Sequence, residues 1–352
     1  MTGPAGNRGQ MAGRGAAEAH APLPADATPR AQAAPFPRAP TVLVAGGAGF
    51  IGAHLCRRLI SRGARVICLD NLETGRREAI ADLMNHPDFL FIRHDVIDPI
   101  DPGEPVDEIY NLACPGSGRQ RAADPLHTFA TSIVGAANLL DLAGRTGAKI
   151  LQASSGAIYG EAPATPVPEI LPGLSDPLGP EAYHDEGKRA AETLFQEMRR
   201  ERGVRTRIAR IFNTYGPGMG PGDGRVVPTF VMQALLGVPL TIHGNGQQRR
   251  SFCYVGDLVE GLMTLMAAPD GLSEPVNLGG ERALSIAQLA ALVIDRTGAS
   301  GEVVYTGAPT DGDRVPDLSR ARDRLGWRPA TGLTQGISRT IEHFQLVVRE
   351  LS

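Results

Sequence analysis

The chain of 352 residues has few cysteines, few aromatic residues and no marked excess of either charge. Its four cysteines, Cys56, Cys68, Cys114 and Cys253, lie far apart and form no C-x-x-C pair. We therefore expect no disulfide framework, no metal site and a reducing, cytoplasmic location. The net charge of −3 provides no long-range attraction to nucleic acid or anionic lipid. No apolar run approaches the ~18 residues that span a membrane, so neither nucleic acid nor membrane is an expected partner.

The length and composition are those of an ordinary globular protein. At ~150 residues per domain, the chain corresponds to two domains, or to one large α/β unit with an appendage. With 42% hydrophobic and 21% charged residues, it can bury a core without disulfides or metals.

Residues 1–38 differ from the rest of the chain. They are rich in Ala, Pro, Gly and Arg, contain one aromatic residue, Phe36, and show no periodicity. Such a segment cannot bury enough apolar area to offset the entropy of ordering, so we expect a disordered N-terminal tail. It lacks the apolar core of a secretory signal; an organelle-targeting leader or a translation start at Met11 are the alternatives.

From Thr41 onward, short apolar runs alternate with segments of helix length. Strand-like runs occupy 41–46, 64–70, 89–92, 108–113, 149–154 and 207–212. This alternation predicts an α/β fold, a Rossmann-type doubly wound parallel sheet, over residues 39–212. Residues 213–352 contain Gly/Pro-rich loops and predict a smaller C-terminal lobe that binds mainly the substrate. Its helices are expected near 228–236, 256–267, 285–298 and 333–348.

A glycine-rich motif lies between the first strand and the first helix. GGAGFIG places Gly46, Gly49 and Gly52 at G-x-x-G-x-x-G spacing, which allows a tight turn, a close approach of the backbone to a pyrophosphate, and helix–strand packing. The helix N-terminus then faces the phosphates, and Phe50 and Ile51 belong to the same predicted cofactor contact.

An acidic residue, Asp70, ends the second strand. A carboxylate there accepts hydrogen bonds from a ribose diol and repels a 2′-phosphate, so the sequence favours NAD over NADP. Arg76 and Arg77 argue for NADP unless they are a solvated loop pair. Asp95, after the third strand, is either an adenine contact or a turn residue.

Several motifs resemble the extended short-chain dehydrogenase/reductase family, and within it the UDP-glucuronate decarboxylases. They are GGAGFIG (46–52), DN (70–71), NLACP (111–115), DEGKR (185–189), ARIFNTYGP (209–217), DGRVV (223–227) and RSFCYV (250–255). The resemblance implies tightly held NAD, with Asn71, Leu112 and Lys188 among its contacts. It also implies a UDP-linked nucleotide-sugar substrate and a homodimer built on helices around 125–145 and 182–201.

The resemblance further implies chemistry at C4 of the sugar. Oxidation of the C4 hydroxyl places a ketone β to the C6 carboxylate, so CO2 can leave through an enolate, and the hydride can return to C4. The protein supplies placement, a base and electrostatic support. The alternatives are a 4-epimerase that retains the carboxylate and a catalytically silent protein that binds NAD and a nucleotide sugar.

The catalytic positions depart from the family pattern. The family places a tyrosine four residues before the lysine, on one helix face, where the ammonium lowers the phenol pKa. Here the lysine is Lys188 and the residue four before it is His184, whereas Tyr183 is rotated by about 100° on a helix. We interpret His184 as the base, because an imidazole with a pKa of ~6.5 suits proton transfer near neutral pH. The alternative is a damaged oxidative site.

A second departure occurs in ASSGAIYG (153–160). Ser155 keeps a hydroxyl that can bond the C4 oxygen, whereas Gly156 and Ala157 replace a serine and a glutamate of the family. Because that glutamate assists at C5 and the carboxyl group, its loss puts decarboxylation in doubt.

The substrate contacts are predicted from the same resemblance. In GSGRQRAA (116–123), Arg119 or Arg121 can hold a carboxylate bidentately, with a solvated loop arginine as the alternative. Contacts to the diphosphate or the sugar are implied for Asn213, Arg250 and Arg314. Val227 and the strand 241–244 are expected to flank the nucleobase.

Overall fold

The computed structural model describes residues 39–160, 165–307 and 312–351, together with Met1. The chain divides into two units, residues 1–38 and 39–352. The disordered tail expected over residues 1–38 lies outside the described residues. The helices and strands of the described residues all belong to the second unit.

A parallel sheet forms the centre of this unit. Within the described ranges, seven strands pair in the order β11–β6–β5–β4–β1–β2–β3, and all neighbouring pairs are parallel. The strands are β1 (Thr41–Ala45), β2 (Arg65–Asp70), β3 (Phe89–Arg93), β4 (Glu108–Asn111), β5 (Lys149–Ser155), β6 (Thr206–Ile211) and β11 (Val276–Leu278). The predicted Rossmann-type fold is confirmed.

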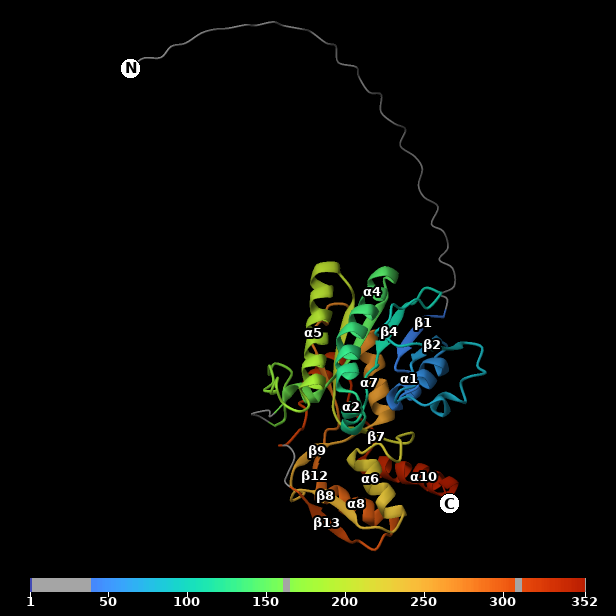
Figure 1. The fold of residues 1–352 in the computed structure, drawn as a ribbon, viewed down its shortest axis with the longest axis vertical. Coiled ribbons are helices and arrows are strands. Elements are labelled where there is room, and N and C mark those ends of the chain that lie inside the picture. Colours follow the sequence, from blue (N-terminus) through green and yellow to red (C-terminus); the bar gives the residue numbers. More distant parts are fainter. Residues whose placement is uncertain (2–38, 161–164, 308–311, 352) are drawn as a thin grey trace. The chain divides into compact units, whose positions relative to one another are not determined.

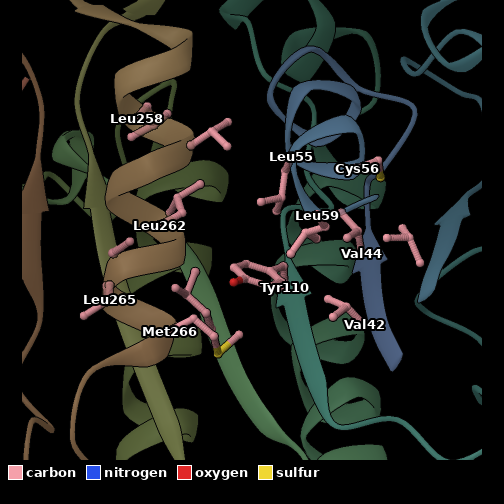
Figure 2. Packing of buried hydrophobic residues seen from close by; sticks show 14 of the residues in the cluster. Val42, Val44, Leu55, Cys56, Leu59, Tyr110, Leu258, Leu262, Leu265 and Met266 are labelled. Atoms are coloured by element: carbon pink, nitrogen blue, oxygen red, sulfur yellow. The ribbon is translucent and has the colours of Figure 1, made fainter. Parts of the chain in front are cut away.

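Helices cover both faces of the sheet. Alternate residues of β1 belong to two different hydrophobic cores, one on each face of the sheet. Val42 and Val44 belong to the core beneath α1 (Phe50–Ser61) and α7 (Val255–Ala267). Figure 2 shows this packing around Tyr110. Leu43 and Ala45 face the opposite core, beneath α4 (Ala136–Thr146) and α5 (Ala182–Arg202).

The helical segment expected around 125–145 contains an irregular turn. It consists of α3 (Pro125–Ala130), the π-helical turn η2 (Thr131–Gly135) and α4. A Cβ atom at Gly135 would lie 2.5 Å from Cγ2 of Val96, so the absence of a side chain lets this turn pack against the loop after β3. The shorter helices before β6 are η1 (Arg77–Ile80), α2 (Gly118–Ala123) and η3 (Gly156–Tyr159).

The C-terminal part forms a lobe with its own core, in which α6 (Val226–Leu235), α8 (Ile286–Thr297) and α10 (Leu333–Leu351) pack together (Figure 1). Paired short strands accompany it: β7 (Thr214–Tyr215) with β10 (Cys253–Tyr254), β8 (Leu240–His243) with β13 (Val303–Thr306), and β9 (Arg249–Ser251) with β12 (Ala283–Ser285). Helix α9 (Ser319–Leu325) lies against β11, not in the lobe. The division at residue 212 stays a prediction, since α7 and β11 follow it and pack on or in the large sheet.

No helix in the described part of the chain is long and apolar enough to cross a membrane.

A buried polar network ties β5, β6, β11 and α5 together. Nη2 of Arg210 lies 2.8 Å from Oε2 of Glu192, and both side chains are about nine-tenths buried. The same carboxylate accepts a 2.6 Å hydrogen bond from the Ser154 hydroxyl. Nη1 of Arg210 donates to the Tyr159 hydroxyl at 2.9 Å, and that hydroxyl donates to Oδ1 of Asn277 at 2.8 Å. The charges are therefore paired inside the protein.

Candidate active site

The ends of β1 and β4 meet where the strand order reverses, and the Leu112 N–H donates to the Ala45 carbonyl at 2.9 Å. Ligands of doubly wound sheets bind at this edge. Three cavities of about 350, 70 and 340 Å³ adjoin here, and Leu112 and Cys114 line all three. We call them the central cavity (containing His184), the acidic cavity (containing Asp70) and the glycine cavity (containing Gly52).

The glycine cavity is lined by the predicted cofactor residues of the GGAGFIG motif, namely Gly46, Gly49, Phe50, Ile51 and Gly52. Gly46 has φ of +77°, and a Cβ atom there would lie 2.8 Å from the Leu112 carbonyl oxygen. A Cβ atom at Gly52 would lie 2.1 Å from the Gly46 carbonyl oxygen. Side chains at Gly46 and Gly52 would therefore fill the space between this loop and α1. Without them, a pyrophosphate can lie against the backbone N–H groups at the start of α1.

Gly52→Ala is expected to lower the free energy of unfolding by about 1–3 kcal/mol, because α1 must move away from the loop. The same movement is expected to weaken NAD binding, which thermal unfolding and a calorimetric titration with NAD would measure. Gly144→Ala is the matched control: its Cβ atom would meet Val204 at an ordinary 3.8 Å. Equal behaviour of the two variants would contradict the steric argument.

The acidic cavity contains Asp70, a residue that is 7% exposed. Its oxygens accept hydrogen bonds of 2.9 Å from the backbone N–H groups of Ala48 and Leu72. A Cβ atom at Gly75 would lie 2.5 Å from Oδ1 of Asp70, so the loop after β2 closes tightly on this carboxylate. Burial raises the pKa of Asp70, and the two N–H groups oppose that rise.

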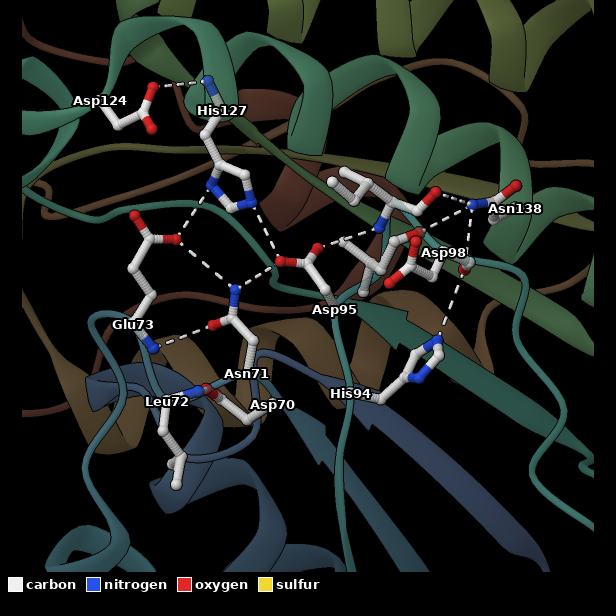
Figure 3. Close-up of polar contacts among 12 residues, drawn as sticks. Asp70, Asn71, Leu72, Glu73, His94, Asp95, Asp98, Asp124, His127 and Asn138 are labelled. Carbon is white, nitrogen blue, oxygen red and sulfur yellow. Dashed lines mark hydrogen bonds and ion pairs between the residues drawn. The ribbon is translucent and has the colours of Figure 1, made fainter.

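A carboxylate–imidazole cluster forms another wall of the acidic cavity (Figure 3). Oδ2 of Asp95 accepts a 2.7 Å hydrogen bond from Asn71 and lies 3.0 Å from Nε2 of His127. Nδ1 of His127 is 2.9 Å from Oε2 of Glu73. Burial raises the pKa of Asp95, but the Ile97 N–H, Asn71 and His127 outweigh it, so the pKa lies below its usual value. His127 and Glu73 were missed from the sequence because their pairing depends on α3 meeting the loop after β2.

The central cavity brings the predicted catalytic and substrate residues together. The predicted residues that line it are Arg121, Ser155, His184, Lys188, Asn213, Val227 and Arg314. They come from α2, β5, α5, the loop after β6, α6 and the segment after β13, so the fold gathers residues far apart in sequence. Tyr183 is not among the described residues that line this cavity.

His184 is 5% exposed, and its Nδ1 lies 2.8 Å from Oδ1 of Asp185. Burial lowers its pKa; Asp185 raises it, whereas Arg121 and Lys188 lower it further, and the net direction is downward. The imidazole is therefore neutral at a pH where an exposed histidine would be partly charged, as a base requires.

Lys188 and Ser155 line the same cavity as this histidine. Lys188 is 5% exposed, and its ammonium donates a 2.9 Å hydrogen bond to the Ala153 carbonyl. The Ser155 hydroxyl accepts a 3.1 Å hydrogen bond from the N–H of Ala157, which leaves its proton able to bond a ligand oxygen.

Arg121 is held at the cavity wall by Glu181. Its Nη2 donates to Oε2 of Glu181 at 2.8 Å, and its side chain is 17% exposed. Its Nε is buried and has no hydrogen-bond partner within the described ranges. The guanidinium as a whole lines the central cavity, and such a group can pair with a carboxylate.

A fourth cavity of about 410 Å³, the lobe cavity, adjoins the central one and shares Asn213, Val226 and Phe252 with it. Arg250 lies here and not in the central cavity, although its backbone pairs with that of Arg314. The strand residues 241–243 line the lobe cavity together with Val226, whereas Val227 is 2% exposed and lines only the central cavity.

Arg225 is a site residue that the sequence interpretation missed. It lines both the central and the glycine cavities. Its guanidinium pairs with both carboxylate oxygens of Asp223, at 2.6 and 2.5 Å, and its Cζ lies 5.4 Å from the Phe50 ring centroid. The DGRVV motif was the available signal, since it places an arginine directly before a helix that begins at the site.

The parallel sheet and its glycine cradle define a dinucleotide-binding enzyme of the Rossmann type. A model of the NAD dependent epimerase/dehydratase family matches residues 42–279. The chain therefore belongs to this family of NAD-dependent enzymes, and NAD is its cofactor.

Curated relatives resemble the chain along most of its length. UDP-glucuronic acid decarboxylase 1 of Xenopus tropicalis is 42% identical over 306 residues, covering 86% of this chain and 72% of the relative. UDP-glucuronic acid decarboxylase 5 of Arabidopsis thaliana is 42% identical over 308 residues, covering 87% of this chain and 89% of the relative. The resemblance expected from the motifs is confirmed.

Solved structures of the family share the fold. A UDP-glucose 4-epimerase from Thermotoga maritima, crystallised with UDP-glucose, has a TM-score of 0.80 and 29% identity, covering 88% of this chain and 99% of that one. A UDP-glucose 4-epimerase from Thermus thermophilus, in complex with NAD, has a TM-score of 0.74 and 28% identity, covering 87% and 99%.

Proposed function

We propose that this enzyme oxidises the C4 hydroxyl of a UDP-linked hexuronate, releases CO2 from C6, and can return the hydride to C4. The single observation that carries the proposal is the convergence of His184, Lys188, Ser155 and Arg121 on one cavity that adjoins the glycine cradle. The resemblance to UDP-glucuronic acid decarboxylases supports the choice of substrate.

The residues have separable roles in this proposal. When bound, NAD accepts the hydride of C4 and can give it back. His184 takes the C4 hydroxyl proton, Ser155 holds the C4 oxygen, and Lys188 supplies positive charge and a donor for the cofactor ribose. Arg121 holds the C6 carboxylate.

The remaining binding roles follow the cavities. Asp70 holds the adenosine ribose, with Asn71 and Asp95 beside it, and the motif Gly46–Gly52 holds the pyrophosphate. The diphosphate of the substrate is assigned to Asn213, Arg250 and Arg314, because guanidinium groups bind such oxygens in pairs. The lobe cavity takes the nucleobase.

Incubation of the purified enzyme with UDP-glucuronate tests the proposal. The expected products are CO2 and a UDP-pentose, both detected by mass spectrometry. A protein that binds NAD but yields neither product would overturn the decarboxylation.

A specific observation favours a second function, C4 epimerisation with the carboxylate retained. Arg121 places a guanidinium in the wall of the central cavity, whereas Ala157 offers no acid at the position where the decarboxylases have glutamate. A guanidinium stabilises a bound carboxylate and so opposes its loss as CO2. A C4-inverted product with all six carbons would distinguish this function from the first.

Arg121→Met is expected to raise the KM for UDP-glucuronate about 10- to 100-fold, because a hydrogen bond to a charged group contributes ~1.5–3 kcal/mol. UDP-glucose, which has no carboxylate, should bind both forms alike. Arg119→Met is the matched control, since Arg119 is exposed and lies two residues away on the same helix. An unchanged KM in Arg121→Met would show that the carboxylate binds elsewhere.

We also propose that the enzyme is a homodimer through the face formed by α3, η2 and α5. Leu126 is 82% exposed there, and Phe129 and Val134 are 39% and 44% exposed. Burying such side chains between two copies is favourable. Sedimentation of a monomer at micromolar concentration would exclude this assembly.

A cytoplasmic location is also part of the proposal. The small number of cysteines and their wide spacing in the sequence support it.

A further inference from the structure

Asp185 lies next to the candidate base in a position that the sequence interpretation did not use. The His184 Nδ1 to Asp185 Oδ1 distance is 2.8 Å, and the two side chains are 6% and 15% exposed. His184 lines the central cavity, and its Nε2 has no hydrogen-bond partner among the residues that the structure describes. Because a carboxylate only accepts hydrogen bonds, this contact requires the proton on Nδ1 and leaves the lone pair on Nε2.

We propose that Asp185 is a positioning residue that fixes His184 in the Nδ1–H tautomer and compensates the charge that the imidazole gains when it deprotonates the sugar. The proposal rests on the proposed function, in which His184 is the base. It assigns Asp185 a role that a tyrosine at position 184 would not need.

The step balances in protons and electrons. The C4 hydroxyl proton would move to Nε2, and NAD, when bound, would supply the oxidant that takes the C4 hydride as the C4–O bond becomes a carbonyl. The base changes from neutral imidazole to imidazolium. A tyrosinate in the same position would change from anion to neutral phenol. Both bases gain one unit of charge, but only the imidazole ends as a cation near Lys188 and Arg121.

The charges around His184 make that added charge significant. On its own helix it faces Asp185 and Lys188, and from α2 it faces Arg121, which is paired with Glu181. Burial, Arg121 and Lys188 lower the pKa of His184, and Asp185 raises it. Asp185 is thus the acidic partner that opposes this decrease in the pKa of His184.

Nitrogen-15 NMR of histidine-labelled holoenzyme tests the tautomer without relying on turnover. The His184 signals are assigned as those present in the wild-type spectrum and missing from the spectrum of His184→Gln. The wild type should show the neutral Nδ1–H form, and Asp185→Asn should lose this single tautomer and titrate at lower pH. An Nε2–H tautomer in the wild type, or an unchanged titration in Asp185→Asn, would overturn the proposal while leaving the proposed function open to its own product test.

Kinetics provide a second readout. Asp185→Asn should lower kcat about 10²-fold with little change in KM, and the acid limb of the pH profile should move to lower pH. In a His184→Tyr background the same substitution should have little effect. Glu186→Gln, which removes a neighbouring carboxylate bonded to Ser175, is the control expected to retain activity. An equal loss from Asp185→Asn in both backgrounds would show a merely structural role.

Discussion

His184→Gln is expected to lower turnover by about 10²- to 10⁴-fold, the usual contribution of a positioned general base. Glutamine is similar in size and can form hydrogen bonds, but it accepts no proton. NAD binding should be retained, since His184 lines neither the glycine nor the acidic cavity. Absorbance of reduced cofactor in a single turnover measures the chemical step, and thermal unfolding confirms that the variant folds.

The adjacent tyrosine provides the control for this experiment. The Tyr183 hydroxyl is buried without a hydrogen-bond partner among the described residues, and burial together with Glu181 raises its pKa, which makes it a poor base. Tyr183→Phe should therefore keep full turnover. If Tyr183→Phe were inactive and His184→Gln active, the assignment of the base would be wrong.

Arg210→Met is expected to lower the free energy of unfolding by about 3–5 kcal/mol, because it leaves the Glu192 carboxylate buried without its cation. Glu192 also accepts a hydrogen bond from Ser154, which precedes Ser155 in β5. Turnover should fall as well, since the strand end that carries Ser155 loses its support. Urea denaturation of the holoenzyme, followed by circular dichroism, measures the change.

An exposed ion pair is the matched control for the buried one. Arg145 pairs with Asp141 one helical turn away, and their side chains are 54% and 60% exposed. Arg145→Met should cost no more than about 1 kcal/mol. Similar losses in Arg145→Met and Arg210→Met would contradict the argument from burial.

Much of the fold and of the cofactor site was predictable from the sequence because the signals are local. The alternation of strands and helices identified the strands of the large sheet to within two residues, except β11. The glycine motif and Asp70 are short-range features tied to a strand end. The short strand β11 escaped notice because three residues give no periodicity, and its place beside β6 is set by long-range pairing.

The rest of the site depends on contacts between distant segments. Arg225 reaches Phe50 across more than 170 residues of chain, and His127 meets Glu73 only once α3 is docked. The one-residue choice between Val226 and Val227 at the lobe cavity depends on where α6 begins. The four-residue spacing predicted His184 and Lys188 on one helix face, and both line the central cavity, but the bond of His184 to Asp185 is decided by side-chain rotamers.

The path of the chain between sheet and lobe also limits how the enzyme can move. After β6 the chain enters the lobe, comes back at α7 and β11, leaves again for β12 and α8, returns at α9 and ends in α10. Several covalent connections therefore cross the same boundary. Any movement of the lobe relative to the sheet therefore requires backbone changes in several connecting segments at once.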